Sequence, residues 1–320
     1  MVGQIHSTQS SRDAEGLQDS ASLVTRPDLL RERLKKDGYL YLPGFVPDAL
    51  LVPLQREFLE IADDAGWLDP SAPLEHFIAN PAAACGPPDP AFMNVHFEMF
   101  GRERLHQFPH ARLFADFFTQ LFGDQPLLHP QIRIRLRFPN FDCTTPAHQD
   151  NFVNGGALET FTVWIPLSDC PEEMGGLQLL RESPGMGLLP ARSDASTGTL
   201  EITCPLPDRW MSADFHFGDA LIFHSLAVHQ AARNVSNRLR ISIDFRFQRL
   251  SDPIDPARFL PPHTLQGWDS LYENWESGEF RYYWRQANLN CAPSLAAIRE
   301  IASSADHPQS SFARELLRHL

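Results

Sequence analysis

The stretch RLRISIDFRF, residues 238–247, alternates strictly between polar and apolar side chains. This period of two predicts a β-strand whose two faces meet different surroundings. The stretch QIRIRLRF, residues 131–138, repeats the pattern with one glutamine and three arginines on its polar side. It could be an ordinary strand with a solvated basic face. Because two strands share the pattern, we favour an architecture whose apolar strand faces meet helices and whose polar faces line an internal cavity.

A His-x-Asp pair, His148 and Asp150, follows the first of these strands after a turn-rich segment. His229 follows another strand-like run, residues 213–223, and lies 229 − 148 = 81 positions further along the chain. That distance leaves room for strands that fold back and bring the two arms together. Two histidines and one carboxylate on one side of a metal suit iron(II) and leave coordination positions open. With 13 histidines in the chain, the tripeptide alone is a weak signal, and its context strengthens it.

Arg240 lies eleven positions after His229, near the start of the 238–247 strand. A guanidinium can form two parallel charge-assisted hydrogen bonds with a carboxylate. The sequence therefore predicts that Arg240 binds the remote carboxylate of a keto-acid cosubstrate.

Four stretches follow one another along the chain: KKDGYLYLPGFVP at 35–47, TPAHQD at 145–150, TVWIPLSDCPEEMGGLQLL at 162–180 and GDALIFHSLAVHQAARNVSNRLRIS at 218–242. In this order they resemble the phytanoyl-CoA dioxygenase family, a branch of the iron(II)/2-oxoglutarate-dependent oxygenases. The resemblance covers roughly residues 30–247. It implies a mainly β fold, a double-stranded β-helix of the jelly-roll or cupin type, with N-terminal and C-terminal helices packed outside.

The resemblance implies that His148, Asp150 and His229 hold iron(II), with 2-oxoglutarate and O2 as cosubstrates. His216 and His224 compete with His229 for the third position. Only His229 has the spacing to the downstream arginine that the family shows. The intact carboxylate favours oxygenation, because halogenating relatives replace it with alanine or glycine.

The same resemblance assigns Arg240 to the C5 carboxylate of 2-oxoglutarate and places Trp164 in the cosubstrate pocket. Core packing is the alternative role for this tryptophan. Thr162 shares its strand face and is a further cosubstrate candidate. Gln131 is the candidate on the first strand.

The substrate is predicted only as a class. Arg133 and Arg135 on the first strand, with Asn151 after the metal motif, are candidate substrate contacts, and the arginines suggest a carboxylate or phosphate. We expect a small metabolite of a biosynthetic pathway, oxidised by hydroxylation of an unactivated C–H bond. Desaturation, cyclisation or epoxidation would use the same site. A jelly-roll protein that binds metal without turnover is the alternative of another class.

The chain departs from the family pattern in one four-residue stretch and at one further position. The chain has RESP at 181–184 where relatives usually have PGSH, a change predicted to affect local packing or substrate access. Ala231 stands where some relatives carry a hydroxyl that orients the cosubstrate. One cosubstrate contact is therefore expected to be absent.

Composition and charge bear on the class of binding partner and on the cellular compartment. The net charge of −13 disfavours nucleic acid, whose phosphates would be repelled. No run of 18 apolar residues predicts a membrane span, and the N-terminus lacks an apolar signal region. Five scattered cysteines without paired spacing indicate a reducing compartment, so we expect a cytoplasmic protein.

The polar, serine-rich residues 1–26 are predicted to form a disordered tail. A single oxygenase domain is expected over 27–320, with its barrel core at about 128–248. The extension 249–320 begins proline-rich, where it is expected to cross the surface, and continues with an aromatic segment and two helical segments. The aromatic segment is either a hydrophobic clasp on the barrel or a lid and homodimer surface.

Three helices are expected before the barrel, at 27–38, 49–66 and 111–123, from the spacing of their apolar residues and the glycines that close them. The sequence YLYLPGF after the first helix predicts a strand. The helices should pack on the outer face of the barrel.

Overall fold

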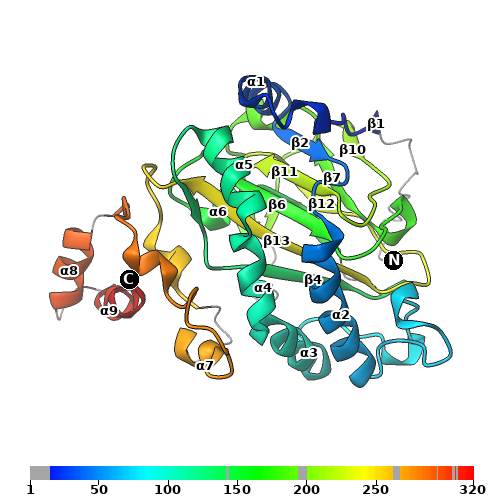
Figure 1. The fold of residues 1–320 in the computed structure, drawn as a ribbon. Coiled ribbons are helices and arrows are strands. Elements are labelled where there is room, and N and C mark those ends of the chain that lie inside the picture. Colours follow the sequence, from blue (N-terminus) through cyan, green and yellow to red (C-terminus); the bar gives the residue numbers. More distant parts are fainter. Residues whose placement is uncertain are drawn as a thin grey trace, which may run out of the picture.

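Two β-sheets face each other in this computed structural model, with helices on the outside of the larger one (Figure 1). The structure describes residues 15–141, 144–193, 200–261, 267–293, 295–304, 307 and 309–320. This is the predicted double-stranded β-helix. The two sheets keep open edges, so the arrangement is a pair of facing sheets and not a closed barrel.

The large sheet runs in the order β2-β11-β6-β13-β3, and β4 also pairs with β13. All of its pairings are antiparallel. Its strands are β2 (Tyr39–Leu42), β3 (Pro126–Leu128), β4 (Arg133–Arg137), β6 (Thr160–Pro166), β11 (Ala220–His224) and β13 (Arg240–Arg249).

The small sheet runs in the order β1-β10-β7-β12-β5 and is antiparallel except for the β1 and β10 pair. Its strands are β1 (Glu15–Gly16), β5 (Thr145–His148), β7 (Leu177–Leu180), β10 (Trp210–Ser212) and β12 (His229–Ala231). A separate hairpin joins β8 (Ala191–Ser193) to β9 (Leu200–Ile202).

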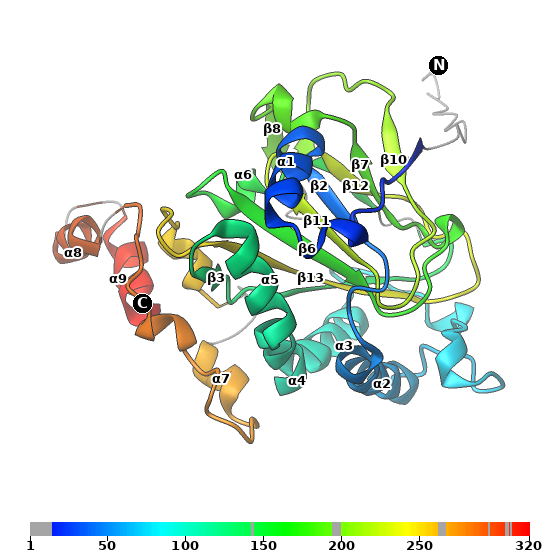
Figure 2. The ribbon, with the colours of Figure 1, turned by 45° about the horizontal axis from the view of Figure 1, so that its top comes forward.

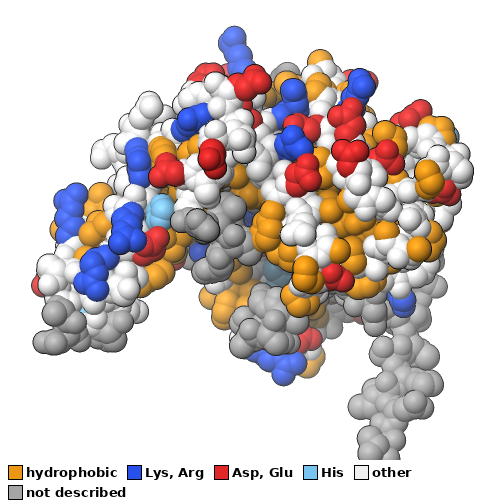
Figure 3. Space-filling view, turned by 90° about the horizontal axis from the view of Figure 1, so that it is seen from below, with side chains coloured by type: hydrophobic (Ala, Val, Ile, Leu, Met, Phe, Trp, Pro, Cys, Tyr) orange, Lys and Arg blue, Asp and Glu red, His pale blue; other side chains and the backbone are white. Residues whose placement is uncertain are grey.

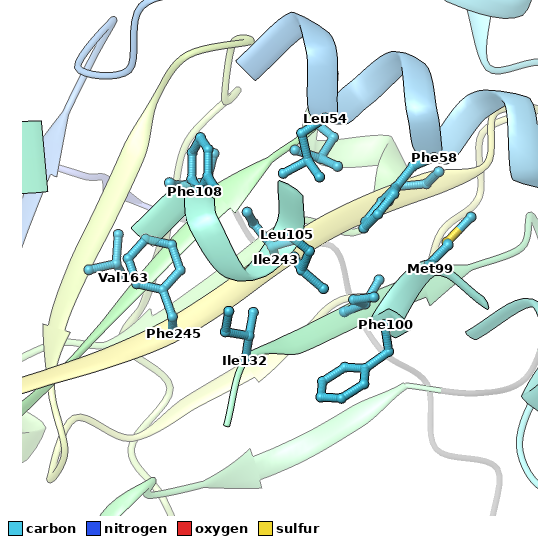
Figure 4. Close-up of a cluster of buried hydrophobic side chains, with 14 of the residues drawn as sticks. Leu54, Phe58, Met99, Phe100, Leu105, Phe108, Ile132, Val163, Ile243 and Phe245 are labelled. Atoms are coloured by element: carbon cyan, nitrogen blue, oxygen red, sulfur yellow. The ribbon is translucent and has the colours of Figure 1, made fainter. Parts of the chain in front are cut away.

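The alternation predicted for the 238–247 strand decides which way β13 faces. Ile241, Ile243 and Phe245 belong to the main hydrophobic core (Figure 4), whereas Arg240 and Asp244 lie on the opposite face between the sheets and are buried as well. The predicted cavity-facing polar strand is therefore confirmed. A strand with charged residues buried on one face needs partners for them, and the site described below supplies those partners.

Helices cover the outer face of the large sheet (Figures 1 and 2). They are α1 (Pro27–Asp37), α2 (Asp48–Asp64), α3 (Pro90–Gly101), α4 (Glu103–Gln107) and α5 (Arg112–Phe122). The three predicted helices are α1, α2 and α5, and left-handed glycines close α1 and α5. The sequence analysis missed α3, because PAFMNVHFEMFG carries apolar residues on more than one side and shows no clear period.

Short 3-10 turns connect these elements. They are η1 (Ala21–Leu23), η2 (Leu74–His76), η3 (Pro81–Ala83), η4 (Phe108–His110), η5 (Glu172–Met174), η6 (Ser183–Met186), η7 (Pro256–Phe259) and η8 (Tyr283–Gln286).

The predicted disordered tail is too long. Residues 1–14 lie outside the described residues, but 15–26 are part of the fold. Glu15 and Gly16 form β1 against β10, and the backbone N–H of Ser20 donates to Tyr41 O at 2.8 Å. Backbone pairing with the sheet orders this segment although its composition is polar.

The C-terminal extension packs on the main core and on β3, as a clasp would. Trp268, Trp275 and Trp284 are buried in the main core, and the Tyr283 hydroxyl donates to Leu128 O. Phe259, in the proline-rich stretch expected to cross the surface, is fully buried instead. The extension contains α7 (Trp268–Tyr272), α8 (Leu295–Ser303) and α9 (Ser310–His319). In the view from below, Lys and Arg side chains gather on this C-terminal part, at the left (Figure 3).

A helix needs a certain length and apolar character to cross a bilayer. None of those formed by the described residues meets this requirement.

Phe245→Ala is expected to lower the free energy of unfolding by about 3–5 kcal/mol. The ring is completely buried and packs edge-on against Phe114, with centroids 5.1 Å apart. Urea denaturation followed by circular dichroism measures the change. Phe312→Ala is the control, because that ring is 50% exposed and its loss should cost under about 0.5 kcal/mol. A loss below about 1 kcal/mol for Phe245→Ala would contradict this packing.

Candidate active site

The three predicted metal ligands converge between the two sheets. His148 ends β5, His229 begins β12, and these two residues are paired in the strand register. Asp150 directly precedes the short helix α6 (Asn151–Asn154). Its Oδ1 atom lies 3.7 Å from Nε2 of His148 and 3.8 Å from Nε2 of His229. Among the described residues, no other group of three or more histidine, cysteine or acidic side chains could hold a metal ion.

Both histidines are oriented by the backbone. Nδ1 of His148 donates to Pro146 O at 2.8 Å, and Nδ1 of His229 donates to Ala227 O at 3.0 Å. A ring that donates from Nδ1 leaves a lone pair on Nε2 in its neutral form. Burial lowers the pKa of His148 to about 3, and burial also lowers the pKa of His229. Both Nε2 atoms are therefore ready to bind a cation at neutral pH.

The two oxygens of Asp150 have different roles. Oδ2 accepts a hydrogen bond from Thr162 Oγ1 at 2.5 Å and another from Arg246 Nη2 at 2.9 Å. Oδ1 faces the two histidines. Burial alone would raise the pKa of this carboxyl, but Arg246 and the histidines hold it well below its usual value. Asp150 is thus a preset carboxylate with one oxygen free for a metal.

Arg246 belongs to a buried chain of charges on the inner face of β13 and β4. Its Nη1 lies 2.5 Å from Asp244 Oδ1, and the other oxygen of Asp244 accepts from Arg135 Nε at 2.8 Å. Sequence analysis placed Arg246 and Asp244 on the polar face but gave them no role. The β-alternation identifies the face of a residue but not its partner across the sheets.

The donor set fits iron(II). Two imidazole nitrogens and one carboxylate oxygen on one side of a metal form the facial triad of non-haem iron sites. Ligands about 2.1 Å from a metal lie roughly 3 Å apart when adjacent, so small inward movements from the observed separations complete the set. A structural metal site would be closed by four protein ligands.

Arg240 lies at the other end of the same space. Its side chain is only 2% exposed, Nη1 donates to Gly175 O, and Nε has no hydrogen-bond partner among the described residues. Gly175 has a φ of 72°, and a Cβ there would lie 2.4 Å from Ala232 O, so only glycine allows this approach. A buried guanidinium with an unsatisfied donor fits the far carboxylate of 2-oxoglutarate.

A cavity connects Arg240 to His148 and His229 and contains about 390 Å3 of space outside the protein atoms, part of it open to solvent. Trp164, Thr162 and Ala231 line it, as the sequence predicted. Trp164 also packs on Phe215, with ring centroids 4.8 Å apart, so it serves the core and the pocket together. Ala231 offers no hydroxyl to a bound keto acid. The other lining residues are Arg135, Thr145, His148, Leu177, Phe223, His229, Gln230, Arg240 and Asp244.

Two competing histidines are excluded. His216 has a side chain that is 73% exposed, and His224 interacts with Glu159 at 3.4 Å. Neither belongs to the metal cluster.

Gln131 does not line the cavity between the sheets, contrary to what the sequence analysis expected. Strand β4 begins only at Arg133, and the Gln131 amide donates to Leu260 O at 2.9 Å in the C-terminal extension. Asn151 is buried, but it does not line this cavity. Arg133 does not line it either. Of the three candidate substrate contacts, only Arg135 lines the cavity.

The departure at 181–184 supports the metal site indirectly. Ser183 is fully buried, its hydroxyl donates to Leu180 O, and it accepts from the backbone N–H of Val228 at 2.8 Å. Val228 immediately precedes His229. The serine therefore fixes the approach to this ligand.

Solved structures share this fold. A non-heme monooxygenase, ThoJ in its apo form, is 18% identical with a TM-score of 0.51, and the match covers 70% of this chain and 78% of that chain. The epimerase SnoN, in complex with Fe3+, alpha ketoglutarate and nogalamycin RO, is 16% identical with a TM-score of 0.51. The match covers 79% of this chain and 92% of that chain. At such identities the likeness establishes the fold alone.

Fold and site together define an iron- and 2-oxoglutarate-dependent oxygenase of the double-stranded β-helix class. The family model for phytanoyl-CoA dioxygenase (PhyH) matches residues 34–242, more than half of the chain. The protein therefore belongs to the phytanoyl-CoA dioxygenase family. The alternative of a metal-binding protein without turnover is set aside by this membership.

Thr162→Val tests the support of Asp150. The change keeps the shape of the side chain and removes the hydrogen bond to Oδ2, so the dissociation constant for iron(II) should rise about 10- to 100-fold. Anaerobic titration against a competing chelator measures it.

Thr160→Val is the matched control. Thr160 lies on the same face of β6, but its hydroxyl donates to Ala157 O and does not touch the triad. An unchanged affinity in Thr162→Val, or an equal loss in both variants, would show that this hydroxyl does not support the metal.

Proposed function

We propose that this oxygenase oxidises an unactivated C–H bond of a small-molecule metabolite, with hydroxylation as the outcome. The observation that carries the proposal is the cavity that His148, His229 and Arg240 line together. A metal held by Nε2 of His148, Nε2 of His229 and Oδ1 of Asp150 would keep its remaining positions on the cavity side. Desaturation, cyclisation or epoxidation would start from the same arrangement.

The protein's residues would act mainly by orientation. Arg240 would fix the far carboxylate of 2-oxoglutarate, so that the keto-acid end points towards the triad. The indole of Trp164, held by its N–H donated to Ser242 Oγ at 3.1 Å, would form one wall of the pocket. Iron with 2-oxoglutarate and O2 would supply the oxidising power, since one oxygen atom of O2 converts the keto acid to succinate and carbon dioxide and the other is left for the substrate.

The buried charges would keep the ligand set unchanged during turnover. Arg246 and Thr162 hold Oδ2 of Asp150, so this carboxylate would bind through one oxygen and leave space for other ligands. The apolar side chains of Phe223 and Leu177 line the cavity beside the triad and would limit entry of water.

A biosynthetic role and a cytoplasmic location are parts of the same proposal. Cys85, Cys170, Cys204 and Cys291 are all free thiols, and a compartment that keeps thiols reduced also favours the ferrous state. Cys143 lies outside the described residues.

Anaerobic titration with iron(II) and 2-oxoglutarate tests the cosubstrate site. A weak visible charge-transfer band, which requires bidentate chelation of the keto acid, should appear in the wild type and be absent in His148→Ala. Arg240→Gln should require about 100-fold more 2-oxoglutarate, because charge-assisted hydrogen bonds to the far carboxylate are lost.

Arg238→Gln is the control for Arg240→Gln. Arg238 lies two positions earlier and donates to His76 O, away from the cavity. It should titrate like the wild type. If iron binds but no band forms in the wild type, the oxygenase proposal is wrong.

A further inference from the structure

The inner face of β4 and β13 carries more positive than negative charge near the triad. Arg133, Arg135 and Arg137 extend from β4, and Arg240 and Arg246 extend from β13. Only two carboxylates, Asp150 and Asp244, accompany these five guanidiniums, which leaves three positive charges in excess. Iron(II) would add two positive charges and the 2-oxoglutarate dianion would remove two, so the excess would remain. Arg258 and Asp255, nearby in the C-terminal extension, add one charge of each sign.

Four of the five guanidiniums have an assigned partner. Arg135 and Arg246 bond to Asp244, and Arg246 also bonds to Asp150. Arg137 donates to Thr145 Oγ1, and Arg240 faces the cosubstrate end of the cavity. Arg133 is different. No carboxylate among the described residues lies within ion-pair distance of it, and it forms no hydrogen bond with them. Arg133 is only partly buried, so its unpaired guanidinium is open to solvent and available to bind an anion.

Arg133 lies near the triad but outside the cavity that leads to Arg240. It pairs with Asp244 in the strand register and lies within electrostatic range of Asp150. Burial lowers the pKa of Arg133 to about 10, so it stays a cation at neutral pH.

Exposed apolar side chains flank the metal loop. Gln149, between the two ligands of that loop, donates to Gly187 O and accepts from the backbone N–H of Leu189, which holds the 186–189 segment beside it. Ser225 bonds to both Leu158 O and Asn151 N. Five of the eight large hydrophobic residues exposed in the described chain lie on these segments. They are Phe152, Val153, Leu158, Met186 and Leu188, here called the apolar rim.

Such a concentration of exposed apolar side chains beside a site indicates a ligand that covers it. We infer that the substrate is an amphiphilic organic anion, a carboxylate or phosphate, whose charged group binds Arg133 and whose apolar part contacts the apolar rim. This inference rests on the proposed function, since it assumes that the triad and Arg240 hold iron and 2-oxoglutarate.

Matched acid and neutral probes test the inference on protein loaded anaerobically with iron(II) and 2-oxoglutarate. The pairs are octanoate with octanamide, 1-naphthoate with 1-naphthamide, and octyl phosphate with octanol. Calorimetry and the shift of the visible band measure binding. At least one anion should bind 10-fold or more tightly than its neutral partner, and the preferred anion distinguishes carboxylate from phosphate. Equal binding within every pair, or no binding by any anion, would overturn the inference.

Variants of Arg133 test where the charged group of the anion binds. Arg133→Gln should weaken the preferred anion about 10- to 100-fold and leave the neutral probes unchanged, and Arg133→Lys should restore part of the loss. Arg112→Gln is the control for surface charge, because that side chain is 92% exposed on α5. Unchanged anion binding in Arg133→Gln would overturn the assignment.

Binding of the apolar part of the substrate to the apolar rim is measured separately. Acetate should bind at least 10-fold more weakly than octanoate, and Leu188→Ser should weaken octanoate but not acetate. Equal binding of acetate and octanoate would overturn the role of the apolar rim.

The visible charge-transfer band distinguishes failure of this inference from failure of the proposed function. Arg133→Gln should form the iron and 2-oxoglutarate band at the same 2-oxoglutarate concentration as the wild type, which also shows that the variant folds. If it does not, Arg133 belongs to the cosubstrate site and the inference is wrong. If the wild type itself forms no band, the proposed function fails instead.

Discussion

The charge-assisted contact of Arg246 with Asp150 is the interaction on which the site depends. A carboxylate buried between two sheets would be protonated or displaced without a cation, because its desolvation is costly. Arg246 and Thr162 occupy Oδ2, which leaves Oδ1 facing the two histidines. The same contact fixes the number of oxygens that Asp150 can offer. The open side of a bound metal, and therefore the chemistry, follows from it.

The fold supplies this contact through one strand. Strand β13 buries both faces, with Ile243 and Phe245 against the helices and Asp244 and Arg246 between the sheets. Helices on the outer face allow the inner face to carry charge, since the apolar face provides most of the packing. Because Arg240 begins the same strand, the cosubstrate end and the metal end of the cavity are held in one rigid element.

Much of the site could be predicted from the sequence, because ligand types and strand alternation are local signals. His148, Asp150 and His229 come together as expected, and Trp164 lines the cavity. Long-range contacts could not be predicted. The alternation of the sequence places Gln131 on the polar face, yet its amide donates to Leu260 O in the C-terminal extension. The order of residues 15–26 likewise comes from backbone contacts with β10 and β2 that a polar composition does not reveal.

A crystal structure of the protein with iron(II) and 2-oxoglutarate, grown without oxygen, would test the central claim most directly. The account predicts iron on Nε2 of His148, Nε2 of His229 and Oδ1 of Asp150, with Oδ2 still bonded to Arg246 and the far carboxylate of 2-oxoglutarate on Arg240. A fourth protein ligand that closes the site, or Asp150 bound through both oxygens with Arg246 displaced, would contradict it.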